Sequence, residues 1–324
     1  MKDRHFQVKI DETLSDKRTQ RNGIPQGSVI SCTIFKLAIN SIVEGLPRDV
    51  RNSLFMDDFC LYISAKKLRQ AERILNLVLK KLDRWTKKTG FKFSLDKTKA
   101  IIFFRDKRWL KEHVVELKLG AHIIPIVAKQ KFLGIMLDKH LNFKAHTEYI
   151  KGKCRKALNL VKKLAHTSWG ADRKTLKLIY KATTLAIVDY GCHIYGSATQ
   201  PVLRKLDPVH NEGLRLATGA FRSSPTTSIQ VESGEPPLAL HRESVIMKSK
   251  LKFLQNNSPI TNLFRQNDIY WKPNGQEDTA PYNIRANRLL RENEIEPEEP
   301  HLTNSPPAWK CKRANFCFNL ISID

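Results

Sequence analysis

Apolar residues recur along this chain with two different periods, which separate a mixed first part from a helical second part. Residues 6–10 alternate between apolar and polar side chains, as a short strand does. Residues 65–89 repeat their apolar positions every three or four residues and predict one long helix lying on a sheet. The stripe of that helix consists of Leu68, Ala71, Leu75, Val78, Leu82 and Trp85.

The segment around Phe55-Met56-Asp57-Asp58 predicts two strands joined by a tight turn. The run Asn52-Ser53-Leu54 precedes it, and Phe59-Cys60-Leu61-Tyr62-Ile63 follows it. Such a hairpin holds two adjacent carboxylates at its tip, where each raises the pKa of the other unless cations neutralise them. Carboxylates of this kind suit magnesium, which could bridge them to a phosphate. A solvated turn without a ligand is the alternative that these residues leave open.

A second irregular stretch, Gly23-Ile24-Pro25-Gln26-Gly27-Ser28, lies before the hairpin. Two glycines around a proline favour a tightly folded loop in which the backbone can approach a ligand closely. The spacing of apolar residues over about 33–43 predicts a helix directly after this loop. A helix N-terminus suits phosphate, although a plain strand-to-helix turn fits the same residues.

Further strands are predicted after Gly90, a natural C-cap for the long helix. Residues 91–95 and 100–104 have the pattern of two strands around the turn Asp96-Lys97-Thr98-Lys99, whose lysines could reach a phosphate or simply be solvated. Residues 114–127 are also rich in strand formers. Residues 131–138 predict a strand in which Gly134 indicates a bend or a close approach of the backbone.

From Asn142 onward the period becomes helical. Helices are predicted over about 142–166, 172–188, 201–218 and 238–255, with glycine and proline between them. Beyond residue 255 the prolines become frequent and an acidic run spans 292–299, which is typical of an extended tail or linker. The sequence therefore predicts an α+β domain over residues 1–138, a helical domain over 139–255 and a tail over 256–324.

The charge of the chain indicates a polyanionic partner. Its 324 residues carry 56 Lys and Arg against 32 Asp and Glu, a formal net charge of +24. Residues 141–166 alone hold seven basic residues against the single acid Glu148, so this helix could contact a nucleic-acid backbone or present a solvated basic face. A membrane surface fits less well, because the basic residues are spread over many segments.

The cysteines and the hydropathy indicate the cellular compartment of the protein. Six cysteines stand at positions 32, 60, 154, 192, 311 and 317, without the spacing of a zinc site or a disulfide framework, as in a reducing compartment. No apolar run approaches the length of a membrane span, and the first residues carry no signal-peptide core. We expect a nuclear or cytosolic protein.

Taken together, these segments resemble the reverse transcriptase of non-LTR (LINE-type) retrotransposons, and most of all the jockey-like kind. Gly23-Ile24-Pro25-Gln26-Gly27-Ser28 resembles the family's motif B, and Phe55-Met56-Asp57-Asp58 its catalytic motif C. The stretch from Gly90 to Lys99 is similar to motif D, and Phe132-Leu133-Gly134 to motif E. Asp189-Tyr190-Gly191 and residues 214–222 resemble the helical region that follows the palm.

The resemblance implies a fold, an activity and a set of roles. The fold would be a partial right-hand polymerase palm followed by an all-helical thumb. The enzyme would be an RNA-directed DNA polymerase that uses an RNA template, a DNA primer, deoxynucleoside triphosphates and two Mg²⁺ ions. Asp57 and Asp58 would be metal ligands and catalytic residues, and Lys97 would be a catalytic residue near the pyrophosphate. The nucleotide and template would contact Pro25, Gln26, Gly27, Ser28 and Phe55. The primer grip would be Phe132, Leu133 and Gly134.

The same resemblance places motif A, with a third metal-binding aspartate, ahead of Gly23, and Asp3, Asp11 and Asp16 lack its pattern. We therefore expect a truncated copy without polymerase activity of its own. Two other hypotheses remain. The chain could be a non-catalytic nucleic-acid-binding remnant that uses its basic helices, or a scaffold whose positive charge only confers solubility.

Overall fold

The structure is a computed structural model that describes residues 4–20, 23–24, 27–65, 67–104, 114–166, 168–255 and 279–295. They form two compact units, and each is described by itself. The first holds the described residues up to Lys99 together with 114–125, and the second holds 100–104 and those from Ile126 onward. Helices and short antiparallel sheets make up both, so the predicted α+β class is confirmed. The division falls near Pro125, ahead of the boundary predicted after residue 138.

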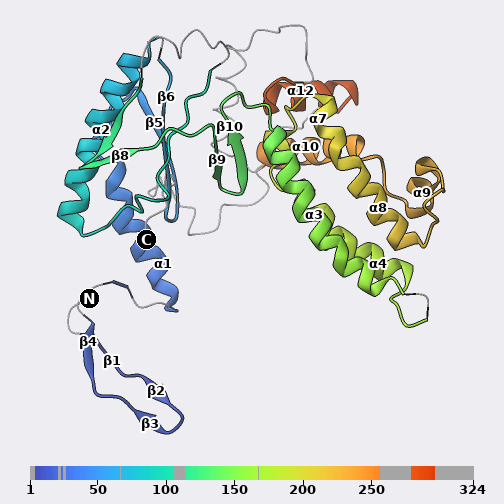
Figure 1. The fold of residues 1–324 in the computed structure, drawn as a ribbon, viewed down its shortest axis with the longest axis horizontal. Helices are drawn as coiled ribbons and strands as arrows, with labels where there is room; N and C mark the ends of the chain where they lie inside the picture. Colours follow the sequence, from blue (N-terminus) through green and yellow to red (C-terminus); the bar gives the residue numbers. More distant parts are fainter. Residues whose placement is uncertain are drawn as a thin grey trace. The chain divides into compact units, whose positions relative to one another are not determined.

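The first unit combines three helical segments with four antiparallel strand pairs (Figure 1). The strands pair as β1 with β4, β2 with β3, β5 with β6, and β7 with β8. In chain order its elements are β1 (Arg4–Phe6), β2 (Lys9–Ile10), β3 (Thr13–Leu14), β4 (Arg18–Gln20), α1 (Val29–Asn40), the 3₁₀ turn η1 (Ser41–Val43), β5 (Val50–Phe55), β6 (Asp58–Ile63), α2 (Leu68–Thr89), β7 (Leu117–Leu119) and β8 (His122–Ile124).

The predicted strand over residues 6–10 is interrupted in the structure, because a serine takes over part of its backbone pairing. The Val8 N–H donates to Ser15 Oγ at 2.9 Å, and the Ser15 N–H donates to the Val8 carbonyl at 2.9 Å. The side chain thus replaces a ladder bond and leaves two short strand pairs instead of one continuous strand. The alternation of apolar residues does not reveal that a serine side chain will bond to the backbone, so the pattern predicted a longer strand than the structure forms.

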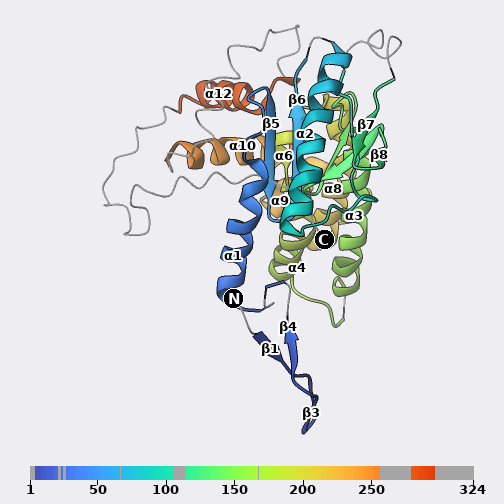
Figure 2. The ribbon, with the colours of Figure 1, turned by 90° about the vertical axis from the view of Figure 1, so that its left-hand side faces the viewer.

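Helix α2 confirms the long predicted helix, and its polar side chains complete strand β7. Asn76 donates through Nδ2 to the Glu116 carbonyl at 2.8 Å and accepts from the Lys118 N–H at 2.9 Å. Glu72 accepts from the Glu116 N–H at 2.8 Å. These bonds satisfy backbone groups that an edge strand otherwise leaves open. Helix α2 packs against β7, and both are labelled in Figure 2.

The two strands predicted at 91–95 and 100–104 are wrong. Phe91 stacks on Trp85 with ring centroids 5.2 Å apart, and Phe35 meets it edge-on at 6.0 Å. The ring is therefore held by aromatic packing without a strand partner for its backbone. Residues 100–104 join the second unit through isolated contacts, such as the Phe104 N–H to the Lys139 carbonyl at 3.2 Å. The alternating apolar residues pack against other side chains here, and their backbones do not pair as strands.

The second unit consists of one hairpin followed by helices, and its described helices run from the green α3 to the orange-red α12 in Figure 1. In chain order its elements are β9 (Lys129–Phe132), β10 (Ile135–Asp138), α3 (Lys144–Leu164), α4 (Arg173–Tyr180), the π-helical turn η3 (Lys181–Leu185), α5 (Ala186–Asp189), α6 (Cys192–Tyr195), α7 (Gln200–Leu203), the 3₁₀ turn η4 (Arg204–Leu206), α8 (Asp207–Thr218), α9 (Thr226–Ser233), α10 (Leu238–Gln255) and α12 (Tyr282–Glu292).

Helix α12 lies inside the segment predicted to be an extended tail. Its apolar face contributes Ala286 and Leu289 to a cluster with Ile246 of α10. Arg285 adds two bonds, from Nε to the Ala280 carbonyl at 2.9 Å and from Nη2 to the His193 carbonyl at 2.8 Å. The frequent prolines around this helix led the composition to predict an extended tail. Pro281, however, sits at the N-cap position, where proline is tolerated, and so does not interrupt the helix.

A buried carboxylate sets the start of α3. Asp138 accepts from three backbone N–H groups, those of His140 at 3.1 Å, Asn142 at 3.2 Å and Phe143 at 2.9 Å. These bonds hold a turn in which Leu141 and Phe143 both have a positive φ, 50° and 57°. Non-glycine residues reach this region only at a cost, which the Asp138 bonds offset. These bonds therefore fix the conformation of the turn between β10 and α3.

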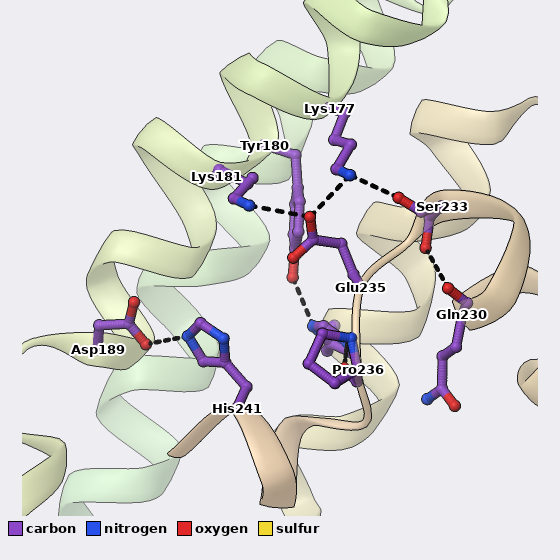
Figure 3. A network of polar contacts seen from close by, with 10 residues as sticks. Lys177, Tyr180, Lys181, Asp189, Gln230, Ser233, Glu235, Pro236 and His241 are labelled. Carbon is purple, nitrogen blue, oxygen red and sulfur yellow. Dashed lines mark hydrogen bonds and ion pairs between the residues drawn. The ribbon is translucent and has the colours of Figure 1, made fainter. Parts of the chain in front are cut away.

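The centre of the helical unit is the fully buried Tyr180. Its hydroxyl donates to His210 Nδ1 at 2.7 Å, because His210 Nε2 faces the Pro236 carbonyl at 3.2 Å and must carry the proton. Burial lowers the pKa of His210 to about 4, so the ring is neutral near neutral pH. The nearby Glu235 accepts from Lys177 and Lys181, each at 2.9 Å, and these contacts fix the loop after α9 against α4 (Figure 3).

Packing against Tyr180 generates a first prediction. A Cβ at Gly213 would lie 2.3 Å from Tyr180 Cε2, whereas a Cβ at Gly152 would meet nothing within 4 Å. Gly213→Ala should lower the free energy of unfolding by about 2 kcal/mol, since overpacking outweighs the gain in helix propensity. Gly152→Ala is the matched control in α3 and should raise it by about 0.5–1 kcal/mol. Urea unfolding of both variants measures the difference, and equal shifts for the two would contradict the packing described.

Candidate functional site

The β5–β6 hairpin presents the paired aspartates at its tip, as predicted. Phe55 pairs with Asp58 at the end of the ladder, so that Met56 and Asp57 form a two-residue turn. At the other positions of β5, Val50 and Leu54 are buried, which fixes the register because a slip of one residue would expose both. The hairpin therefore holds Asp57 and Asp58 at a constant place relative to its buried face.

The turn itself carries backbone strain. Met56 has a φ of 58°, the left-handed region that favours glycine. A positive φ at the first turn residue matches the twist of the flanking strands, which is why such two-residue turns form in hairpins. Methionine at this place costs of the order of 1 kcal/mol relative to glycine. Strained residues of this kind cluster at functional sites, and this one lies directly beside both aspartates.

Asp57 and Asp58 offer a donor set that fits a hard divalent cation. Asp57 is exposed and Asp58 half-buried, and both contribute only carboxylate oxygens, the ligands that Mg²⁺ prefers. Two adjacent carboxylates also repel one another, a cost that a bound cation removes. Within the described ranges no cluster of three or more His, Cys, Asp or Glu side chains gathers around a point. The described residues thus supply two carboxylates to such a site.

The structure places the glycine-rich loop directly before a helix N-terminus, as predicted, although the helix starts earlier than expected. Gly27 has a φ of 90° and Ser28 is the N-cap of α1, which begins at Val29 instead of near residue 33. The side chain of the N-cap Ser28 makes no capping hydrogen bond to the first turn of α1. Its N–H groups and the positive end of the helix dipole suit an anion. Pro25 and Gln26 lie outside the described residues.

Lys97 lies in the turn that ends the extended segment after α2. Its side chain is exposed, and the Thr98 N–H and hydroxyl both donate to the Ser94 carbonyl, at 3.0 Å and 2.8 Å. The strands predicted on either side of this turn did not form, but the turn did. Asp57, Asp58, Gly27, Ser28, Phe55 and Lys97 all belong to the first unit.

Phe132, Leu133 and Gly134 belong to the second unit, where they form the end of the β9–β10 hairpin. Phe132 pairs with Ile135, and the turn residues Leu133 and Gly134 have positive φ values of 44° and 80°. The predicted bend at Gly134 is therefore a tight hairpin turn.

A tyrosine from far along the chain holds this turn. Tyr190 donates from its hydroxyl to the Leu133 carbonyl at 2.7 Å. A Cβ at position 134 would lie 2.7 Å from Tyr190 Cε1, so the close approach requires glycine. His146 of α3 adds a second tie, since its Nδ1 accepts from the Met136 N–H at 3.1 Å. Burial lowers the pKa of His146 to about 4, which keeps the ring neutral and able to accept.

Sequence reasoning missed the roles of Tyr190 and His146. The motif-like string Asp189-Tyr190-Gly191 was the available signal, but the string alone does not say which segment it contacts. His146 carried no signal beyond its position in the predicted helix. Both contacts depend on how distant parts of the chain pack.

The basic face predicted for residues 141–166 is present on α3. Two ion pairs involve α3, since Lys162 contacts Glu212 at 2.6 Å and Glu148 contacts Lys205 at 2.8 Å. Lys144, Lys156 and Lys163 are exposed and have no carboxylate within 4.0 Å among the described residues. An uncompensated row of this kind attracts a phosphate backbone.

None of the helices within the described ranges has the length and apolar composition needed to cross a lipid bilayer.

A hairpin with adjacent carboxylates, a helix N-terminus and a basic helical unit are features of the class of nucleotidyltransferases that act on nucleic acids. Comparison with known families agrees. Residues 3–137 match the family described as reverse transcriptase (RNA-dependent DNA polymerase). This match and the relatives below support a relation of the chain to the reverse transcriptases of non-LTR retrotransposons.

Several curated relatives are of this kind. The chain is similar to the probable RNA-directed DNA polymerase from transposon BS of Drosophila melanogaster, with 25% identity over 67% of this chain and 24% of that protein. It is also similar to the RNA-directed DNA polymerase from mobile element jockey of the same species, with 25% identity over 76% of this chain and 27% of the relative. A Pol polyprotein from the type-1 retrotransposable element R1 of Bradysia coprophila matches at 25% identity over 53% of this chain and 17% of its own length.

The chain thus spans about a quarter of the length of the first two of these relatives. The resemblance to a non-LTR reverse transcriptase that the motifs predicted is confirmed.

Strain at the hairpin tip leads to a second prediction. Met56→Gly should raise the free energy of unfolding of the first unit by about 0.5–1 kcal/mol, because glycine adopts a positive φ without steric cost. Met56→Ala keeps the Cβ and therefore the strain, so it serves as the matched control for loss of the methionine side chain. Denaturant unfolding followed by circular dichroism measures both. Equal stability of the two variants would show that the turn is not strained.

Proposed function

We propose that this chain is the part of an RNA-directed DNA polymerase in which the β5–β6 tip holds catalytic metal ions. The observation that carries the proposal is the strained turn that holds Asp57, with Asp58 directly after it at the start of β6. It lies within the segment that matches the reverse transcriptase family. Family membership alone supports a divalent cation in general, and the choice of Mg²⁺ rests on the all-oxygen donors of these two side chains.

Asp57 and Asp58 would hold the metal by their carboxylate oxygens. When bound, a pair of Mg²⁺ ions lowers the pKa of an attacking hydroxyl and neutralises charge on a transferring phosphoryl group. The protein's own contribution is to fix the positions of the carboxylates, which the buried register of β5 and the two-residue turn achieve. Phe55, 61% exposed beside them, offers an apolar surface to a nucleotide.

Other predicted residues take supporting roles in this proposal. Gly27 and Ser28, with Pro25 and Gln26 before them, would shape the pocket for nucleotide and template at the start of α1, where N–H groups favour phosphate. Lys97, exposed in its turn, would approach the pyrophosphate.

The second unit would supply the nucleic-acid contacts. Phe132, Leu133 and Gly134 would act as a primer grip on a hairpin that Tyr190 holds in place. The exposed lysines of α3 would follow the backbone of an RNA template and DNA primer without reading sequence. In this proposal the first unit is the palm and the helical unit the thumb. The buried thiols of Cys154 and Cys192, whose pKa values burial raises to about 12, are compatible with the nuclear or cytosolic compartment that we infer.

A two-metal centre in this family takes a third carboxylate, and the described residues supply two. We therefore propose that the 324-residue polypeptide, tested by itself, binds nucleic acid without extending a primer. A non-catalytic role as a nucleic-acid-binding remnant is the second candidate, favoured by the uncompensated lysines of α3. A scaffold role predicts no nucleic-acid affinity at all.

Filter binding of an RNA–DNA primer–template across a range of salt concentrations tests this proposal. We expect log affinity to fall steeply with log salt, and Lys144→Ala/Lys163→Ala to reduce that slope by about 2, roughly one for each lost phosphate contact. Lys80→Ala/Lys88→Ala removes two exposed charges of α2 in the first unit that, like Lys144 and Lys163, have no carboxylate within 4.0 Å among the described residues, and is the matched control. A flat or absent binding signal would reject nucleic-acid binding and leave the scaffold.

Primer extension on a poly(rA) template, with magnesium or manganese, tests the expected inactivity and the role of the hairpin tip. No extension is expected from the polypeptide alone. Extension that disappears in Asp57→Ala would contradict the expected inactivity and establish the metal site directly. Extension that survives in Asp57→Ala would contradict the role assigned to the hairpin tip.

A further inference from the structure

A cavity of about 390 Å³ opens in the helical unit where the β9–β10 turn, α3 and the π-helical turn meet. Its walls are mainly apolar and aromatic, formed by Ile150, Ile187, Tyr149 and Tyr190. The volume is within the range of small-molecule sites. It lies entirely in one compact unit, so its shape does not depend on how the two units are arranged.

Small residues keep this cavity open. Gly134 has no side chain, and Ala182 and Ala186 expose only a methyl group on the side of the π-helical turn and of α5. A π-helical turn inserts one extra residue into a helical run and shifts the residues that follow. Such turns are frequent at functional sites. Here the turn brings Ala182 and Thr183 to the wall of the cavity.

Two ammonium groups converge beside the cavity. Lys131 of β9 and Lys153 of α3 each place Nζ 5.1 Å from the ring centroid of Tyr149. Hydrogen bonds from Lys131 and Lys153 lower the pKa of the Tyr149 hydroxyl. Within the described part of the chain, neither lysine has a carboxylate within 4.0 Å. Two like charges held at one phenol without an acid form a place where an anion is favoured.

We propose that this cavity binds one nucleotide unit, with the base between Tyr190, Ile150 and Ile187 and the phosphate at Lys131 and Lys153. The two halves of the site point to the two halves of this ligand. A simple anion would not interact favourably with the apolar walls, and an uncharged apolar molecule would not interact favourably with the paired lysines. A base with its phosphate uses both, since every base has a flat apolar face that packs on aromatic rings.

The proposal deepens the proposed function and rests on it, because the nucleotide is most simply supplied by a strand that the lysines of α3 already hold. A base taken out of its stack costs a few kcal/mol in a duplex and least in a single strand, so an unpaired strand is the favoured source. A free nucleoside monophosphate has the same chemistry. Both sources predict that the cavity, and not the basic face, selects the base.

A short 5′-phosphorylated oligonucleotide with 2-aminopurine at its 5′ end tests the site on the full chain. The fluorescence of this base changes when it leaves water and packs on an aromatic ring. We expect Lys153→Ala to weaken the fluorescence-detected binding about ten-fold, since it removes a phosphate contact and part of the wall. Ala186→Trp, which fills the cavity, should abolish the fluorescence change, and circular dichroism checks that this variant remains folded.

Lys174→Ala is the matched control, because it removes an exposed charge of α4 in the same unit, away from both the cavity and the α3 lysines. It should leave the fluorescence change intact and weaken binding by less than about two-fold. If Lys153→Ala and Lys174→Ala behave alike and Ala186→Trp keeps the fluorescence change, the cavity proposal fails while nucleic-acid binding stands. If the wild-type chain binds no oligonucleotide, the proposed function and the cavity proposal fail together.

Competition experiments identify which parts of the ligand the cavity recognises and whether a free nucleotide also binds. The monophosphate of 2-aminopurine deoxyriboside should compete with the oligonucleotide more strongly than inorganic phosphate at the same concentration, which supports a site for base and phosphate together. Direct binding of this monophosphate that Ala186→Trp abolishes would extend the site to free nucleotides. Equal competition by inorganic phosphate would reduce the site to an anion contact and overturn the proposal.

Discussion

The register of β5 against β6 is the constraint on which the candidate metal site depends. Because Val50 and Leu54 are buried on one face, the pairing of Phe55 with Asp58 cannot slip without exposing them. That register forces a two-residue turn, and the turn forces Met56 into a positive φ. Core packing thus fixes the consecutive residues Asp57 and Asp58 at the tip, and the strain at Met56 accompanies the placement of two like charges.

In the helical unit, distant contacts take the place of a sheet in positioning the β9–β10 turn. Tyr190 approaches Gly134 so closely that no side chain fits there, and its hydroxyl satisfies the Leu133 carbonyl. His146 stays neutral because it is buried, and it completes the attachment through the Met136 N–H. The same residues border the cavity, so one set of packing contacts fixes the turn and shapes the proposed nucleotide site.

Local patterns predicted the elements that are organised locally. The apolar stripe of α2, the C-cap at Gly90 and the hairpin around Asp57 all appear in the structure. The strands expected around Phe91 did not form, because aromatic packing on Trp85 used the apolar residues instead. Helix α12 was hidden by neighbouring prolines, and the partners of Gly134 lie on helices far along the chain. The local turns and helices that carry the motif residues were therefore predictable, whereas the contacts that position these elements required the fold.

Binding of paramagnetic Mn²⁺, followed by nuclear magnetic resonance of the isotopically labelled chain, tests the metal role of the hairpin most directly. The account predicts that amide signals at the β5–β6 tip broaden first. It further predicts that this selectivity disappears in Asp57→Asn/Asp58→Asn, while Asp83→Asn, an aspartate of α2 paired with Lys87 at 2.6 Å, leaves it unchanged. Broadening that is spread evenly over exposed carboxylates, or that persists in the double variant, would contradict the assignment of this hairpin as a metal site.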